Sequence, residues 1–192
     1  MKLIEIMGIA FGIGILLLII LLLHSQQVPL LNDVHNHADI KIVLNNEPYN
    51  LNQTKYMSPK NNAKSPFMHL HEDDGDILHQ HISDGSLGLF FESISMNLSS
   101  ECFILDNKTA YCNNEESQVR MYVNGRENKL FERYIFKDLD RILITFTKPD
   151  IASIQEQISK VTDKACIQSG KCPERGMPGN ESGCTTEGGC DA

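Results

Sequence analysis

The 192-residue sequence has no excess of basic residues, because 17 Lys and Arg stand against 25 Asp and Glu and give a formal net charge of −8. Binding to nucleic-acid phosphates requires a basic face, so nucleic acid is excluded as the main partner. Also lacking are a phosphate-binding loop, a Gly-x-Ser-x-Gly nucleophile elbow and a Cys-x-x-Cys pair. We therefore expect a binding protein that does not turn over a substrate.

Only one long apolar run is present, which excludes a multi-pass transporter. Residues 6–23 carry no charge, and as a helix they span about 27 Å, close to the hydrocarbon thickness of a bilayer. No small-x-small cleavage site follows at residues 24–27, although a cleaved signal peptide requires one. The run predicts an uncleaved single-pass membrane anchor, with a cleaved signal as the alternative.

The few charges near this run predict its orientation. Lys2 and the amino terminus lie on one side, whereas residues 24–40 contain no Lys or Arg, so the N-terminus is expected in the cytoplasm. All six cysteines lie beyond the run, and an even number of cysteines fits an oxidising compartment. We expect a cell-membrane protein whose C-terminal domain is extracytoplasmic.

The pattern of apolar residues divides the rest of the chain. We expect an anchor at 1–24, a tether at 25–36, an extracytoplasmic domain at 37–148, an amphipathic helix at 149–165 and a cysteine-rich, irregular tail at 166–192. Within the domain, strands are predicted at 40–44, 49–51, 102–105, 110–112, 118–124 and 141–147, a hairpin at 67–82 and a helix at 87–96. The helix 87–96 follows a capping sequence that ends in Ser86 and has apolar residues at helical spacing. The helix 149–165 has one apolar stripe, formed by Ile151, Ile154, Ile158 and Val161. Asn45-Asn46 and Asn124-Gly125 are turn signals.

This order of strand, hairpin, helix and a last strand opening on residues 138–141 (Asp-Leu-Asp-Arg) resembles the β-grasp fold of ubiquitin-like proteins, notably the sulfur carriers. The resemblance implies an α+β fold, a mixed sheet with one packed helix. Sulfur carriers end in a Gly-Gly carboxylate, whereas here Gly188-Gly189 is followed by three more residues. Carrier chemistry therefore does not transfer, and function must be argued from a site.

Histidines provide the strongest chemical signal. Six of the seven form three His-x-His triplets, His35/His37, His69/His71 and His79/His81. Residues i and i+2 of a strand point to the same face. In the hairpin, a turn centred on Gly75 pairs His71 with His79 and His69 with His81, which places four exposed rings on one face. The opposite face is the expected core side and carries the apolar residues Met68, Leu70, Leu78 and Ile82.

Opposed imidazoles of this kind can hold one ion, because Cβ atoms of paired residues lie about 4.5–5.5 Å apart. Imidazole suits Zn and Cu better than Ca or Mg, so the sequence predicts a Zn or Cu site at the hairpin. His35 and His37 would add a fifth ligand or form a second site. Glu72, Asp73, Asp74 and Asp76 would support the site or supply a carboxylate ligand. The alternative is a histidine-rich surface that responds to pH.

The cysteines predict structural cross-links. Cys102 and Cys112 flank a turn-like Asp106-Asn107, and we expect a disulfide across that hairpin. The last four, Cys166, Cys172, Cys184 and Cys190, allow three pairings among which the sequence does not choose. Structural zinc sites usually contain more closely spaced Cys pairs, so disulfides are favoured.

Several segments together are similar to an uncharacterised group of membrane-anchored proteins from archaea and small-genome bacteria. These segments are residues 37–41 (His-Ala-Asp-Ile-Lys), the His-x-His hairpin, residues 138–141 and residues 172–176 (Cys-Pro-Glu-Arg-Gly). The resemblance covers nearly everything after the anchor. In that group the hairpin turn reads Asp-Gly-Asp-Gly-Asp, whereas residues 72–76 here read Glu-Asp-Asp-Gly-Asp. Some members are labelled protein-disulfide isomerase, but the group supplies no established activity.

These observations predict a membrane-anchored, extracytoplasmic protein that binds Zn or Cu and sequesters or delivers the ion. A first alternative is a disulfide-stapled interaction module without metal, whose protein partner the sequence does not identify. A second alternative is a thiol-disulfide oxidoreductase, which the missing Cys-x-x-Cys disfavours.

Overall fold

The computed structural model describes residues 33–58, 65, 67–70, 74–148, 150–179, 184–185 and 189–190. The expected anchor and most of the expected tether lie outside these residues. Within the described ranges, no helix has the length and apolar character needed to cross a membrane. The anchor therefore stays a prediction from the sequence.

The fold is mixed α+β and consists mostly of sheet. The main sheet has the order β3 (Met68–His69), β4 (Ile77–Ile82), β1 (Asp33–Leu44), β10 (Arg141–Thr147), β8 (Gln118–Val123) and β9 (Arg126–Glu127), and β2 (Glu47–Tyr49) also pairs with β1. β1 and β10 are parallel, and the other pairs in the sheet are antiparallel. β1 begins at Asp33, so it includes part of the expected tether.

Two smaller sheets and four short helical segments complete the described structure. β5 (Asn97–Leu98), β6 (Cys102–Ile104) and β7 (Ala110–Cys112) form one sheet, and β11 (Cys184–Thr185) pairs with β12 (Gly189–Cys190). The helical segments are α2 (Leu87–Ser93), the 3-10 turn η1 (Phe131–Arg133), α3 (Ile151–Ser159) and α4 (Ala165–Gln168). Cys166 therefore lies inside a short helix, not in the irregular tail expected from residue 166.

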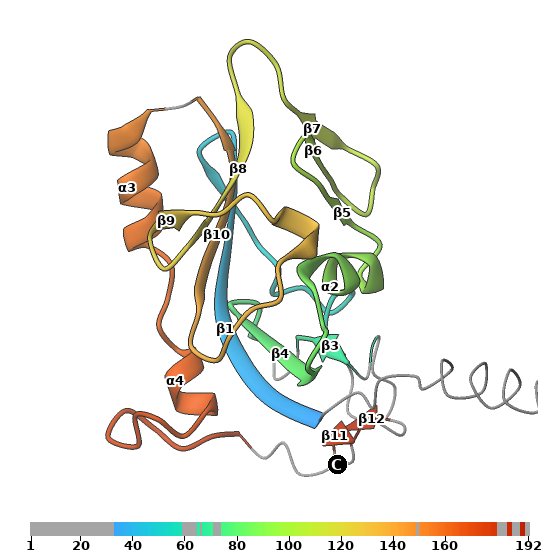
Figure 1. The fold of residues 1–192 in the computed structure, drawn as a ribbon, viewed down its shortest axis with the longest axis vertical. Coiled ribbons are helices and arrows are strands. Elements are labelled where there is room, and N and C mark those ends of the chain that lie inside the picture. Colours follow the sequence, from blue (N-terminus) through green and yellow to red (C-terminus); the bar gives the residue numbers. More distant parts are fainter. Residues whose placement is uncertain are drawn as a thin grey trace, which may run out of the picture. The chain divides into compact units, whose positions relative to one another are not determined.

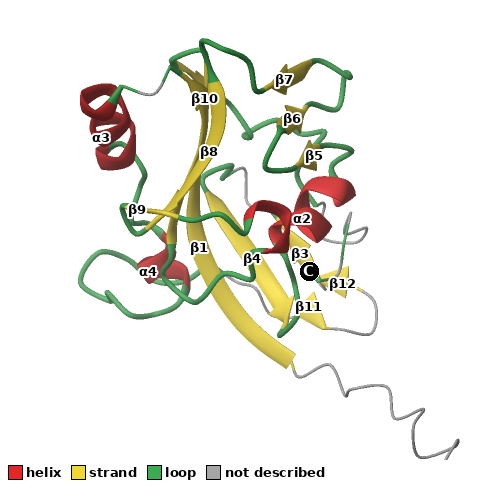
Figure 2. Ribbon diagram, turned by 45° about the horizontal axis from the view of Figure 1, so that its top comes forward, coloured by secondary structure: helices red, strands yellow, loops and turns green. Residues whose placement is uncertain are grey.

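Alternation along β1 separates the two faces of the main sheet. Ile40 and Ile42 point into the larger core together with Phe90 and Phe91 of α2, whereas Val43 packs in a second cluster with Ile154 of α3. α2 and α3 accordingly lie on opposite sides of the sheet (Figures 1 and 2). The odd-numbered residues of β1 thus face α3, and this face also carries His35 and His37.

The predicted helix 87–96 forms, but it is shorter. Ser86 caps α2 by accepting a hydrogen bond from the backbone N–H of Leu89, and Phe90, Phe91 and Ile94 are buried as the helical spacing requires. The helix ends at Ser93 because Ser95 adopts a left-handed φ of 62°.

Both predicted asparagine turns are present. Asn45 and Asn46 have φ of 53° and 67°, and Asn124 and Gly125 have φ of 51° and 79°. Two consecutive left-handed residues are typical of the type I′ turn that joins twisted antiparallel strands. These turns explain why β2 folds back on β1 and β9 on β8.

The amphipathic helix predicted at 149–165 forms only as α3, which Asp150 caps and which ends at Ser159. Ile154, Ile158 and Val161 pack against the sheet as expected. Ile151, the first residue of the expected apolar stripe, is instead 79% exposed, because it lies in the first turn of the helix, before the helix meets the sheet.

Two tyrosines, the buried Tyr56 and the partly buried Tyr134, make stability sensitive to alkaline pH. Burial, together with hydrogen bonds to Tyr49 and Asp106, raises the pKa of Tyr56 well above its usual value, and burial next to Asp140 raises the pKa of Tyr134. The folded chain thus keeps protons that the unfolded chain releases above about pH 10. Their contribution to stability is complete below that pH and is lost as the pH rises toward the folded pKa values.

We therefore expect the free energy of unfolding, measured in urea, to be lower at pH 10.5 than at pH 8.5. In Tyr56→Phe the difference between the two pH values should shrink. An equal difference in wild type and variant would contradict the assignment to Tyr56.

Candidate metal centre

Five of the six triplet histidines lie on one face of three adjacent strands. In the register of the main sheet, His79 of β4 is paired with His37 of β1 on one side and with His69 of β3 on the other. His81 lies two residues after His79 on β4 and so shares that face. His35 lies where the pairing of β1 with β4 shifts register, and its ring contacts the rings of His37 and His81. His71 lies outside the described residues. The sequence did not predict that β1 would join the hairpin in this way.

The expected hairpin register is wrong. His69 pairs with His79 and not with His81, so the register is displaced by two residues. β3 ends at His69, and the next residue, Leu70, forms a parallel bridge with Met57. Because the displacement is even, the histidines keep their common face.

The five imidazoles form a closed circuit of ring contacts. Going around it, the ring centroids are 4.7 Å apart for His35–His37, 4.7 Å for His37–His79, 5.7 Å for His79–His69, 5.0 Å for His69–His81 and 4.9 Å for His81–His35. Each ring in the circuit contacts a ring on the same strand, on a neighbouring strand, or on both. All five rings are therefore neighbours within one patch.

Three of these histidines have ligand atoms close enough for one ion. One ring nitrogen from each of His35, His37 and His79 lies within 4.8 Å of the others. Tetrahedral coordination at about 2.0–2.1 Å separates nitrogen ligands by about 3.3 Å. Small rotations of the three side chains would bring their nitrogens to this shorter separation. In the described part of the chain, this histidine group could hold a metal ion.

The prediction that the hairpin imidazoles are exposed is wrong for the three that the structure describes, His69, His79 and His81. His37, His69, His79 and His81 are all buried, whereas His35 is exposed. Part of the reason is that α4 packs on β1, and Ser169 directly after α4 touches His37. The site is consequently a partly enclosed one that opens at His35.

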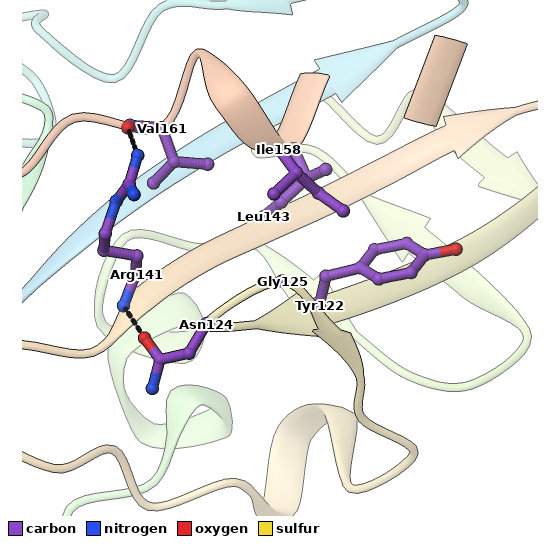
Figure 3. A pocket seen from close by; sticks show the side chains of 7 residues that line it. All are labelled: Tyr122, Asn124, Gly125, Arg141, Leu143, Ile158 and Val161. Atoms are coloured by element: carbon purple, nitrogen blue, oxygen red, sulfur yellow. Dashed lines mark hydrogen bonds between the residues drawn. The ribbon is translucent and has the colours of Figure 1, made fainter. Parts of the chain in front are cut away.

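The segment that crosses this face is residues 161–169, which we call the strap. Arg141 of β10 fixes its start, because its guanidinium donates to the carbonyl oxygens of Val161 and Thr162. Figure 3 shows this contact with Val161 beside a hollow of about 30 Å³ under α3. That hollow has room for water and for no organic ligand.

Asp39 fixes the middle of the strap. Its carboxylate, which is 1% exposed, accepts hydrogen bonds from the Thr162 hydroxyl, from the backbone N–H of Lys164 at 2.7 Å and from that of Ala165 at 3.1 Å. Burial raises the pKa of Asp39, and these hydrogen bonds oppose the rise. The Asp39 carboxylate therefore caps the N-terminus of α4 and links this helix to β1.

Lys164 ties the strap to the hairpin turn. Its ammonium group lies 3.2 Å from a carboxylate oxygen of Asp74 and 2.8 Å from one of Asp76. Burial alone would lower the pKa of Lys164, but the two carboxylates raise it. Asp74 and Asp76, which we expected beside the metal, thus pair with the strap.

Asp39, Asp138 and Ser169 are contact residues of the site that sequence reasoning missed. For Asp39 a signal existed, because it lies two residues after His37 on the same face of a strand. Nothing local identifies Ser169, which is 132 positions away from His37.

Four of the six cysteines form two disulfides in the described residues. The expected disulfide between Cys102 and Cys112 joins β6 and β7, and a second links Cys166 to Cys172. Cys184 and Cys190 are paired residues of β11 and β12 in the backbone register. Neither described disulfide has the Cys-x-x-Cys spacing of a thiol oxidoreductase.

Removing the first disulfide should lower stability substantially. It closes a loop of sequence separation 10, and loop-closure entropy predicts a loss of roughly 3 kcal/mol in the Cys102→Ser, Cys112→Ser double variant. Urea unfolding under non-reducing conditions measures it. A loss below about 1 kcal/mol would show that the hairpin is held by its packing alone.

A second hollow lies along β1, between the end of β2 and the start of β4. Its volume is about 180 Å³, and it is lined by residues including Lys41, Tyr49 and Asp76. Pockets that bury organic ligands usually have about 300–1,000 Å³. Neither this hollow nor the one under α3 is therefore a good substrate site, and the histidine cluster is the strongest candidate site in the described residues.

Comparisons with known proteins do not assign the chain to a family: no family model, no curated protein and no solved structure matches it. The functional argument consequently rests on the geometry of the histidine cluster.

Proposed function

We propose that this protein binds one transition-metal ion, Zn or Cu, through His35, His37 and His79, with His69 and His81 completing the ligand cluster. The observation that carries the proposal is the circuit of five imidazoles supplied by three adjacent strands. Neutral imidazole is a preferred ligand of Zn and Cu and a poor one for Ca and Mg. The carboxylate oxygens of Asp74 and Asp76, which could otherwise serve as metal ligands, are already paired with Lys164.

In this proposal the ion is cargo that the protein sequesters or delivers. An exposed His35 next to buried ligands suits exchange of the ion with a partner. The apolar run at residues 6–23 and the cysteine usage support a location at the extracytoplasmic surface of the cell membrane.

Elemental analysis of the natively purified full-length chain tests the proposal. After treatment with EDTA and repletion, we expect close to one equivalent of Zn or Cu per chain. Less than about a tenth of an equivalent after repletion with either metal would reject the proposal.

We also propose that the described domain is β-grasp-like. Support comes from the two parallel central strands β1 and β10, from the order β4-β1-β10-β8-β9, and from a helix that follows β4 and packs on one face. Membership in the uncharacterised membrane-anchored group is proposed on the same sequence segments as before.

A disulfide-stapled interaction module is the second candidate function. It is favoured by the cross-linked hairpin of β6 and β7 and by the disulfide that follows the strap. This candidate predicts a protein partner recovered by crosslinking, with an affinity that changes between pH 5 and 7, and no retained metal.

A further inference from the structure

The loop before β10 is attached to the backbone of His37. Asp138 Oδ1 accepts the backbone N–H of His37 at 3.0 Å, and the backbone N–H of Leu139 donates to the His37 carbonyl at 2.7 Å. The same Asp138 oxygen accepts the hydroxyl proton of Ser169. Ser169 Oγ lies 2.8 Å from His37 Nδ1. Asp138, Ser169 and the His37 ring therefore form one hydrogen-bonded chain.

Counting the available protons shows which atom donates in each of these hydrogen bonds. A hydroxyl has a single proton, and Ser169 donates it to Asp138. Ser169 then offers only oxygen lone pairs to His37, so Nδ1 must be the donor. In a neutral imidazole whose Nδ1 carries the proton, Nε2 carries the lone pair.

His69 independently has the same proton arrangement. Its Nδ1 lies 3.0 Å from the backbone carbonyl oxygen of Ser65, and a carbonyl oxygen can only accept. Two histidines on different strands thus have Nδ1 engaged as a donor. Metal-binding histidines commonly donate one ring N–H to a carbonyl, carboxylate or other acceptor and ligate through the other nitrogen.

We propose that Ser169 and Asp138 are positioning residues for His37, which hold its ring in the Nδ1–H tautomer and present Nε2 to the metal. The metal-binding part of this inference rests on the proposed function. The strap is built for such a role, because Asp39 anchors α4 just before Ser169, and the Cys166–Cys172 disulfide closes the loop that contains Ser169. A mobile serine could not select a tautomer in this way.

The test is ¹⁵N NMR of the imidazoles in the metal-free, full-length chain at pH 8. We expect a pyrrole-like Nδ1 and a pyridine-like Nε2 for His37. Ser169→Ala should shift His37 toward the Nε2–H tautomer and weaken Zn binding about 10- to 100-fold. Ser169→Thr, which keeps the hydroxyl, should restore both. Ser159→Ala on α3 is the matched control and should change neither.

Asp138→Asn gives a second, independent variant. The new amide can donate to Ser169, whose proton is then available to Nδ1, so the Nε2–H tautomer of His37 should become more populated. Backbone amide spectra establish that each variant is folded.

A wild-type His37 in the Nε2–H form, or a tautomer unchanged by both Ser169→Ala and Asp138→Asn, would overturn the positioning role. A serine-dependent Nδ1–H tautomer in a chain that retains no metal after repletion would support the positioning role and reject the proposed function. The NMR readout therefore separates the two failures.

Discussion

Replacing His37 and His79 together by Ala is expected to abolish metal binding. Both belong to the three histidines whose ligand atoms lie within 4.8 Å of one another, and His79 is also the residue paired with His69. Loss of an outer-shell partner alone typically costs 10- to 100-fold in affinity, so loss of two ligands should cost more than about 100-fold. Competition against a coloured chelator measures the affinity for Zn and Cu.

The matched control is His24→Ala, because His24 belongs to no His-x-His triplet. It should retain the wild-type affinity. Circular dichroism of the metal-free proteins separates loss of ligands from loss of fold. A folded double variant that binds as tightly as wild type would place the metal elsewhere.

Replacing Asp39 by Ala is expected to release the strap and to destabilise the chain. Three donors, the Thr162 hydroxyl and the backbone N–H groups of Lys164 and Ala165, lose their acceptor. Each buried donor left unsatisfied costs about 1–3 kcal/mol. Removing a desolvated carboxylate recovers part of that, because burial raises the pKa of Asp39 and so opposes its ionisation. We expect a net loss of roughly 3 kcal/mol.

Urea unfolding in EDTA measures this loss, and limited proteolysis with trypsin at Lys160 and Lys164 reports release of the strap. Asp163→Ala is the control within the same segment. Its carboxylate pairs with Arg175 at the surface, and an exposed pair of this kind contributes little to stability. If Asp39→Ala is as stable and as resistant to trypsin as Asp163→Ala, Asp39 does not anchor the strap.

Much of the fold could be predicted because its signals are local. Helical spacing and a serine cap identified α2, and paired asparagines identified the turn from β1 to β2. The strands β7 and β10 have the predicted bounds. Alternation also placed Met68 and Leu78 correctly on the core side of the hairpin.

The register of the hairpin could not be predicted, because a distant contact determines it. Leu70 pairs with Met57, and Gly75 lies so close to the backbone of residues 51 and 52 that a Cβ atom there would come within 2.3 Å of the Asn52 nitrogen. These contacts shape the turn, and the sequence between the two strands contains no sign of them.

Burial of the histidines was missed for a related reason. Alternating polar residues before an apolar strand are typical of a tether or a solvent-exposed face. This pattern therefore predicted that His35 and His37 lie before the first strand of the sheet. In the structure, a segment more than 100 positions later covers His37 and binds Asp39. Such long-range pairing is outside the reach of a local pattern.

X-ray absorption spectroscopy of the metal-repleted, full-length chain tests the histidine site most directly. The account predicts three or more imidazole nitrogens at about 2.0–2.1 Å from the ion, with the outer-shell scattering of imidazole rings. A shell made only of oxygen atoms, or of sulfur at about 2.3 Å, would contradict it.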